Sequence, residues 1–326
     1  MPENKQKSIF TNPIVLVIGA LLCCALWGSA TPFIKLGSAA MISQNPATKV
    51  ASTILFAGIR FTGAGVLTVL IYSIARRKFL VPKAKNIPRI LTVSAFQTVI
   101  QYIFFYIGLS NTSGVKGTIA SGLSGFFCVL IASLIFKQEK LTVRKIVACV
   151  LGFAGIVVVN LNGLDFNFVF TGDGFVIISA LSLAISSVLM KRFSKHEEPV
   201  LISGYQFVIG GIFMIGIGLI FGGSIRIPDF GAAMILVYLC ALSAVAYALW
   251  GVLLKHNPVS RVTIFNFSTP FFGTVLSILM LPESAGTGVL NIIATLLLVS
   301  AGIFLLNFQP KKPLPNIPES SQNQNK

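Results

Sequence analysis

The sequence predicts an all-α membrane protein with ten transmembrane helices, arranged as two inverted repeats of five helices, with both termini in the cytoplasm. Of its 326 residues, 55% are hydrophobic and only 10% are charged, which lies outside the range of soluble globular domains. Ten apolar stretches each approach the roughly 20 residues that a helix needs to cross the hydrocarbon core. The stretches also fall into two groups of five that resemble each other in sequence.

Short loops separate the ten stretches and leave no room for a soluble domain. The first stretch, at about 25 residues, is too long for the apolar region of a signal peptide, so we expect an uncleaved helix. The expected helices cover 13–37, 50–75, 88–109, 113–136, 143–160, 172–190, 199–221, 231–254, 259–281 and 287–307. The expected units are an N-terminal tail (1–12), a first repeat (13–160), an outer connecting loop (161–171), a second repeat (172–308) and a disordered C-terminal tail (309–326).

The two halves share a sequence register around the fourth and ninth stretches. A shift of 144 positions places Val115 to Glu139 on Val259 to Glu283 without a gap, and Ser124 then matches Ser268. Because each repeat contains an odd number of spans, the second copy must enter the membrane in the opposite sense. Inverted repeats of this kind are typical of secondary transporters, in which two related halves move around a site near the bilayer midplane.

The basic residues lie on alternate sides of the predicted spans. The net charge is +16, but 20 Lys and Arg residues fall in the two tails and the loops after even-numbered spans, against two, Lys49 and Arg226, in the other loops. The positive-inside rule places the more basic side in the cytoplasm. The basic excess is therefore a topology signal, and it does not indicate nucleic-acid binding.

Polar side chains three or four residues apart give six of the spans a polar face, namely the first, third, fourth, sixth, eighth and ninth. Unsatisfied amides are costly in lipid, so we expect them to face protein or water. Small hydroxyl residues also let helices pack closely, and that is the commoner role for a single Ser or Thr. The candidates for a substrate cavity are Trp27, Arg60, Gln97, Gln101, Ser121, Ser186, Tyr247, Trp250, Asn266 and Pro270. The fifth and tenth spans carry Gly152, Gly155 and Gly302 and almost no polar side chains, so we expect them to pack tightly outside the cavity.

Arg60 is the one formal charge deep inside a predicted span. It lies roughly 15 Å from the start of the second span, too far to reach the outer surface comfortably. A charge at that depth costs at least ~2.5–3.5 kcal/mol unless it is paired or hydrated, so Arg60 should point into the bundle. Two roles stay open: contact with an anionic group of a substrate, or a structural role on backbone carbonyls and neighbouring helix ends.

No Asp or Glu lies in the middle of a predicted span, so a carboxylate-based proton relay within the membrane is not visible. Glu139 and Glu283, which mark the repeat, should cap or tether helix ends at opposite faces. Lys35 and Lys116 lie near outer ends, where snorkelling is the default explanation and a vestibule role the alternative. The five cysteines show no metal-ligand or disulfide spacing, and the sequence predicts free thiols, no metal site and no cofactor.

Several local patterns resemble the EamA-type transporters of the drug/metabolite transporter superfamily. They are Leu26-Trp27-Gly28-Ser29 with Pro32 and Lys35, Arg60, Lys137-Gln138-Glu139-Lys140-Leu141-Thr142, and Ser268-Thr269-Pro270-Phe271-Phe272-Gly273 leading to Glu283. The resemblance covers about residues 13 to 308. One departure is Phe126, which faces Pro270 in the repeat register where the family usually has a proline.

The resemblance implies a ten-helix bundle, multi-pass in the cell membrane, that moves small organic metabolites, often amino acids or related compounds and commonly outward. A membrane-embedded enzyme would need a nucleophile, an acid–base pair or a metal cluster, and the spans contain none of these patterns. A passive channel has much the same composition and stays open as the alternative. The sequence also leaves open whether two copies associate as a homodimer.

Overall fold

The computed structural model describes residues 8–43, 45–161, 167–280 and 289–308, and these form an all-helical bundle. The only strand-like pairing within these ranges is an isolated bridge between Ile42 and Ile225. The helices are α1 (Pro13–Met41), α2 (Lys49–Ala75), α3 (Ile87–Ser94), α4 (Gln101–Ser110), α5 (Gly114–Leu130), α6 (Val143–Val159), α7 (Phe175–Phe193), α8 (Pro199–Ile220), α9 (Phe230–His256), α10 (Val259–Thr263), α11 (Ser268–Met280) and α12 (Val289–Asn307).

Nine helical segments in the described part of the chain are long and apolar enough to cross a membrane. They correspond to nine of the ten predicted spans. The remaining predicted span, the fifth at 143–160, is α6. It is an apolar helix of 17 residues and is shorter than the other nine segments. The all-helical membrane class is therefore confirmed, with nine spans by length and α6 as a shorter apolar helix. The C-terminal tail and the centre of the connecting loop lie outside the described residues.

Four of the predicted spans are not uniform α-helices. The sixth begins in a π-helical segment, Phe170–Gly174, before α7. A π-helical segment, Ala95–Ile100, joins α3 to α4, and another, Ile131–Ile135, follows α5. A 3₁₀ segment, Ile264–Phe267, joins α10 to α11 in the ninth span. The break therefore precedes Pro270, which lies in the first turn of α11, where proline is tolerated because that N–H has no intrahelical partner. At Phe126, α5 continues without a break.

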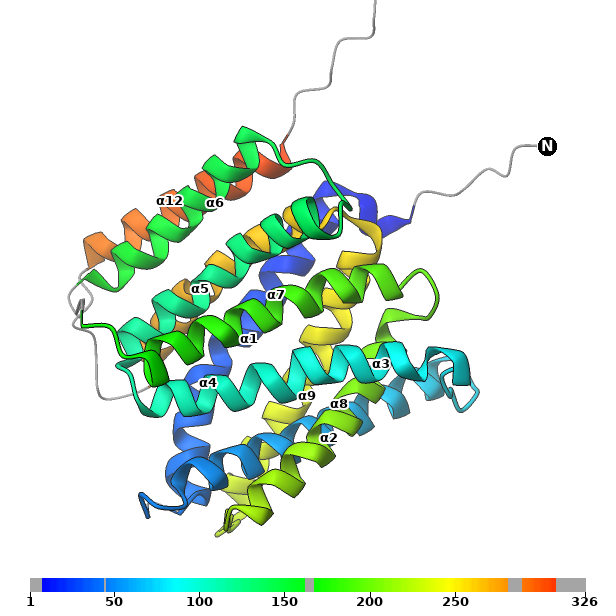
Figure 1. Cartoon of the computed structure of the whole chain (residues 1–326), viewed down its shortest axis with the longest axis vertical. Coiled ribbons are helices and arrows are strands. Elements are labelled where there is room, and N and C mark those ends of the chain that lie inside the picture. The colour runs from blue at the N-terminus through cyan, green and yellow to red at the C-terminus, as the bar shows by residue number, and fades with distance from the viewer. Residues whose placement is uncertain (1–7, 44, 162–166, 281–288, 309–326) are drawn as a thin grey trace, which may run out of the picture.

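The helices of the two halves pack against each other in a reciprocal pattern (Figure 1). α2 lies along α8, and α6 lies along α12 at one edge of the bundle. α1 packs on α9 and α11, while α7 packs on α4 and α5. The predicted close packing of the fifth and tenth spans is confirmed, because a Cβ on Gly302 would lie 2.7 Å from the Ala148 carbonyl oxygen.

Glycines allow the α2–α8 contact. A Cβ built on Gly65 would lie 2.6 Å from the Gly204 carbonyl oxygen, and one on Gly58 would lie 2.8 Å from the Gly211 carbonyl oxygen. A real Cβ at either position would overlap the backbone of the facing helix. The two helices can therefore lie this close only because glycine, which has no side chain, occupies these positions. In α8 the participating glycines recur every seven residues, at Gly204, Gly211 and Gly218, so they share one face of the helix.

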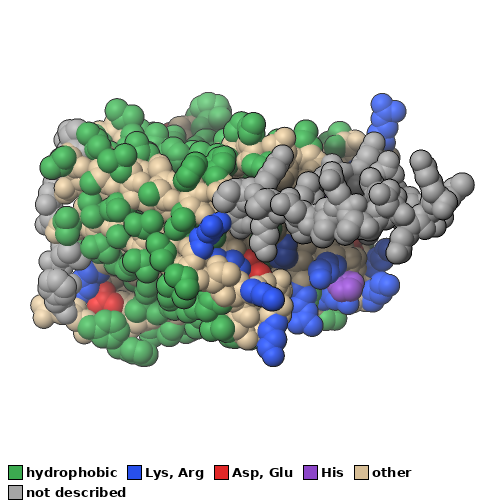
Figure 2. All heavy atoms as spheres, turned by 90° about the horizontal axis from the view of Figure 1, so that it is seen from above, with side chains coloured by type: hydrophobic (Ala, Val, Ile, Leu, Met, Phe, Trp, Pro, Cys, Tyr) green, Lys and Arg blue, Asp and Glu red, His purple; other side chains and the backbone are tan. Residues whose placement is uncertain are grey.

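The loops gather at two ends of the bundle. At one end, the Asn86 side chain donates to the Glu197 carboxylate, so the loops after the second and sixth spans meet. The Asn257 side chain donates to the Phe10 carbonyl, so the loop after the eighth span meets the N-terminal segment. At the other end, the Ser224 amide donates to the Ser52 hydroxyl. Figure 2 shows hydrophobic side chains covering the flank, with many Lys and Arg side chains gathered toward one end. An apolar flank between polar ends suits a bilayer.

Candidate functional site

The Arg60 guanidinium is the centre of a buried cluster between α2, α4 and α9. Arg60 is 4% exposed and lies 11 residues after the first residue of α2, about 17 Å along the helix. Its guanidinium carbon is 4.3 Å from the ring centroid of Phe61 and 5.8 Å from that of Tyr102. Cation–π contacts of this kind stabilise a charge that has left water. Within the described residues, no ion pair joins Arg60 to a carboxylate.

Phenol groups surround the guanidinium. The Tyr102 ring is one of the two cation–π partners of Arg60, and the Tyr106 ring centroid is 5.8 Å from that of Tyr102. The Tyr102 and Tyr247 hydroxyls are 2.7 Å apart and share a hydrogen bond between α4 and α9. Tyr247 also packs edge-on against Phe207 of α8, with ring centroids 4.8 Å apart. The phenols supply polar groups that can turn toward a bound ligand without adding a fixed negative charge.

The aromatic cluster continues to α1 through tryptophans. The Trp27 ring centroid is 5.1 Å from that of Tyr247 and 4.9 Å from that of Trp250. Four predicted cavity residues, Trp27, Arg60, Tyr247 and Trp250, therefore belong to one contiguous cluster that joins α1, α2, α4, α8 and α9.

Several buried polar atoms of α1, α2 and the third span have no hydrogen-bond partner within the described structure. Two are donors, the indole nitrogen of Trp27 and Nε of Arg60. Two are acceptors, the side-chain oxygens of Gln97 and Gln101, from the π-helical segment and the first residue of α4. Buried polar groups are almost always satisfied in folded proteins, so such a set needs a chemical explanation. π-helical segments also occur frequently at functional sites.

Other predicted cavity residues lie outside this cluster. The hydroxyls of Ser121 and Ser186 donate to carbonyls of their own helices, Gly117 and Leu183. This is the helix-internal bonding common for serine in apolar helices. Asn266 is half-buried in the 3₁₀ segment, and Pro270 is half-buried in α11.

The lysines near the outer ends have different surroundings. Lys35 is exposed on α1. Lys116 pairs with Asp173, with 3.0 Å between Nζ and the carboxylate, and its side chain is only 13% exposed. Thr112 donates a short hydrogen bond to the same carboxylate. Lys116 thus links the start of α5 to the π-helical segment before α7 (Phe170–Gly174). A vestibule role for it stays a prediction.

Glu139 tethers a helix end, as the sequence predicts. One of its carboxylate oxygens accepts from the Ser260 amide at 3.0 Å and the other from the Ser260 hydroxyl at 2.8 Å. Lys145 pairs with the same carboxylate at 3.1 Å. Glu139 therefore joins the loop before α6 to the first turn of α10, in the other half. Glu283 lies outside the described residues.

Comparison with known proteins decides the family. The EamA-like transporter family matches residues 14–161 and again 170–308, which together span most of the chain. The chain belongs to the EamA-like transporter family. Its resemblance to the drug/metabolite transporters is thereby confirmed, and the duplicated match coincides with the two repeats predicted from sequence.

Relatives of this EamA-like chain come from plants, archaea and bacteria. A WAT1-related chloroplast protein of Arabidopsis thaliana is 24% identical, with 85% of this chain and 68% of the relative covered. An uncharacterized transporter of Archaeoglobus fulgidus is 24% identical over 87% of this chain and 96% of its own. Another from Bacillus subtilis is 25% identical over 88% and 89%. The family and these names indicate a transporter rather than an enzyme.

A solved structure shares the fold of this EamA-like chain. Its TM-score is 0.71 at 16% sequence identity, with 89% of this chain and 95% of that chain covered. In the present structure two of the family-like motifs touch each other. A Cβ on Gly28 of α1 would lie 2.6 Å from the Phe272 Cβ and 2.8 Å from the Gly273 amide nitrogen of α11. The glycine lets α1 approach α11 closely.

The cluster also contains residues that sequence reasoning missed. Tyr102 and Tyr106 belong to a run of aromatic and aliphatic residues that looks lipid-facing, and only their four-residue spacing marks a shared face. Gln206 of α8 is fully buried and accepts from the Thr98 hydroxyl at 2.7 Å, and it could have been noticed as a lone amide in an apolar helix.

Proposed function

We propose that this EamA-like chain exports small organic metabolites that bear a carboxylate, such as amino acids or related compounds, across the cell membrane. Transport occurs by alternating access of two inverted five-helix halves, with α6 counted as the tenth membrane span. The proposal rests on one observation above all, the reciprocal pairing of helices between the halves.

The pairing supports an inverted two-fold relation. The second span of each half packs on the second of the other (α2 with α8), and the fifth packs on the fifth (α6 with α12). The first span of each half packs on the third and fourth of the other, as α1 does on α9 and α11, and α7 on α4 and α5. Reciprocal contacts of this kind are what a two-fold axis generates. Five spans in each half place that axis in the membrane plane, as in transporters that expose a central site to each side in turn.

The unpartnered polar atoms of α1, α2 and the third span support a carboxylate-bearing cargo. The unpartnered donors, Trp27 Nε1 and Arg60 Nε, suit a carboxylate, and arginine binds one through two parallel hydrogen bonds. The unpartnered oxygens of Gln97 and Gln101 suit an ammonium group. An amino acid carries both groups. Arg60 also lacks a carboxylate partner in the described part of the bundle, so an anionic cargo would compensate its buried charge.

Both termini are placed in the cytoplasm in this proposal, because the loops that meet at one end carry the basic residues. Alkaline phosphatase folds only outside the cytoplasm. A fusion after Gly223 should therefore be active, and a fusion after Lys195 should be inactive. The reverse pattern with both fusions stably expressed would contradict the orientation.

Export is tested by overexpressing the chain in a bacterium and challenging the cells with toxic amino-acid analogues. Cells should gain resistance to at least one zwitterionic or acidic analogue and accumulate less of it than cells with the empty vector. The matched control is the Arg60→Met protein discussed below, which should reach the membrane folded but give little or no resistance. Unchanged sensitivity to every analogue, with the wild-type protein present in the membrane, would argue against carboxylate export.

A further inference from the structure

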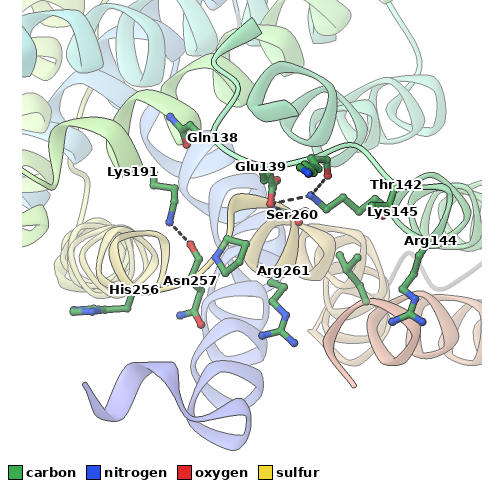
Figure 3. Close-up of a pocket in the computed structure, with 13 residues that line it drawn as sticks. Gln138, Glu139, Thr142, Arg144, Lys145, Lys191, His256, Asn257, Ser260 and Arg261 are labelled. Carbon is green, nitrogen blue, oxygen red and sulfur yellow. Dashed lines mark hydrogen bonds and ion pairs between the residues drawn. The ribbon is translucent and has the colours of Figure 1, made fainter. Parts of the chain in front are cut away.

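Two adjoining hollows lie at the basic end of the bundle, outside the Arg60 cluster. The first has a volume of about 510 Å³ and the second about 400 Å³. Both are bordered by Gln138 and Lys191, so they meet along a common wall. Figure 3 shows the first, with side chains from the loop before α6, from α6, α7 and α10, and from the α9–α10 connection directed around it.

The walls of these hollows are strongly positive. Among the described residues, five cations and one carboxylate, that of Glu139, line the first hollow. The described residues that line the second include four cations and no carboxylate. Glu139 is already engaged by Ser260 and by Lys145, so it neutralises one neighbour at most. The cations of the first hollow are Lys140, Arg144, Lys145, Lys191 and Arg261.

Two of these cations are held in place by carbonyl oxygens. Lys191 Nζ donates to the Leu254 carbonyl at 2.9 Å and to the Asn257 carbonyl, beyond the end of α9. The Arg261 guanidinium donates to the Asn307 carbonyl at 3.0 Å. Carbonyl dipoles orient these side chains but leave their formal charges uncompensated. The wall is thus preorganised for an anion, and its field is focused by the enclosing protein.

Three cations of the first hollow, Lys145, Lys191 and Arg261, are half-buried, whereas Lys140 and Arg144 at its mouth are exposed. Lys78 and Lys85, at the same end, are exposed and line neither hollow. The hollow brings together Arg144 of α6 from one half, and Lys191 of α7 and Arg261 of α10 from the other.

The surroundings place this basic wall beside the apolar flank. Ile135, three residues before Gln138, is 69% exposed, and Val143, next to Arg144, is 78% exposed. Exposed apolar side chains directly beside a cationic hollow place the hollow at the boundary between the hydrocarbon core and the headgroup region of the bilayer. Basic pockets between transmembrane helices on this side bind lipid phosphates.

We infer that the first hollow binds a phosphate-bearing anion, and that its source is the headgroup of an anionic phospholipid. The phosphate lies against Lys191 and Arg261, with Lys140 and Arg144 at the exposed mouth of the hollow. It competes with Glu139 for Lys145. Because the Glu139–Ser260 contact joins the two halves, a bound headgroup lies beside a contact between them. The inference needs only a membrane-embedded chain and is independent of the cargo.

The test measures binding, not transport, so its failure is distinguishable from failure of the proposed function. The purified full chain, in phosphatidylcholine nanodiscs or zwitterionic detergent, is titrated with short-chain phosphatidylglycerol, with short-chain phosphatidylcholine, or with inorganic phosphate at constant ionic strength. Bound ligand is measured by native mass spectrometry and by the shift in unfolding temperature. Phosphatidylglycerol should bind and phosphatidylcholine should not.

Two charge-matched variants then locate the site. Lys140→Gln with Arg144→Gln should weaken phosphatidylglycerol binding about 25-fold, about fivefold for each lost charge. Lys78→Gln with Lys85→Gln removes the same charge from the same end and should change binding by less than about twofold. A different outcome is that inorganic phosphate binds, and is weakened only by the Lys140/Arg144 variant, while phosphatidylglycerol does not bind. That result would support a phosphate site whose natural ligand is a soluble phosphate compound and would contradict the lipid headgroup as the ligand. Equal weakening by both variants, or no binding of either probe, would overturn the inference.

Discussion

Replacing Arg60 by methionine will reduce transport by about 100-fold at low cargo concentration while leaving the protein folded. Hydrogen bonds to a charged group contribute about 1.5–3 kcal/mol, and their loss removes up to about two orders of magnitude in binding. Folding should not suffer, because a buried charge without a carboxylate partner is replaced by an apolar side chain of similar length. Transport in proteoliposomes and the unfolding temperature are measured on the same preparation.

Two further variants make the Arg60 experiment decisive. Arg60→Lys keeps the charge but cannot form two parallel hydrogen bonds, so it should raise the cargo concentration for half-maximal transport more than it lowers the maximal rate. Lys49→Met removes an exposed charge from the first turn of the same helix and should transport normally. A joint loss of transport and unfolding temperature in Arg60→Met would assign Arg60 a structural role. Normal transport by Arg60→Met would exclude both roles.

The second large effect concerns the α2–α8 contact. Gly211→Ala should lower the free energy of unfolding by about 3 kcal/mol, the upper part of the usual range for overpacking. The added Cβ would lie 2.4 Å from the Thr62 hydroxyl and 2.5 Å from the Thr62 amide nitrogen, and a backbone atom cannot rotate away. The loss is measured by thermal unfolding and by the yield of monodisperse protein in detergent.

Gly216, on the same helix, provides the matched control for this experiment. A Cβ there meets nothing within 4 Å. Alanine is favoured over glycine inside a helix by about 1 kcal/mol, so Gly216→Ala should be as stable as the wild type or slightly more stable. Equal destabilisation by the two substitutions would show that helix contact at Gly211 is not the cause.

The helices could be predicted from the sequence because each membrane span is identified by its own run of apolar residues. That run can be read without knowing which other segments the span contacts. It also predicted the close packing of the fifth and tenth spans, where Gly155 faces Val299 and the Thr295 hydroxyl donates to the Gly155 carbonyl. The helix-end role of Glu139 followed from its place after a span. The α2–α8 contact had a signal that sequence reasoning passed over, the seven-residue spacing of Gly204, Gly211 and Gly218.

The remaining features depend on contacts between segments far apart in sequence. Lys116 pairs with Asp173, 57 positions away, and no local pattern gives the path of the connecting loop. The 3₁₀ break comes before Pro270 because Phe267 inserts between α5 and α6, where a Cβ on Gly125 or Gly152 would clash with its ring. Tyr102 and Tyr106 were missed because their neighbours in sequence are apolar. An aromatic residue in a membrane span is common on lipid-facing positions too, so the sequence alone does not distinguish a buried tyrosine from a lipid-facing one.

The central claim is that this EamA-like chain is an alternating-access carrier, and counterflow tests it most directly. Proteoliposomes are loaded with a high concentration of the unlabelled solute identified by the export screen and diluted into a trace of labelled solute, without an ion gradient. An alternating-access carrier predicts transient accumulation of label above its external concentration, because outward movement of unlabelled cargo returns the site to the outside. Label that only equilibrates, with no overshoot, would contradict the account and indicate a passive channel.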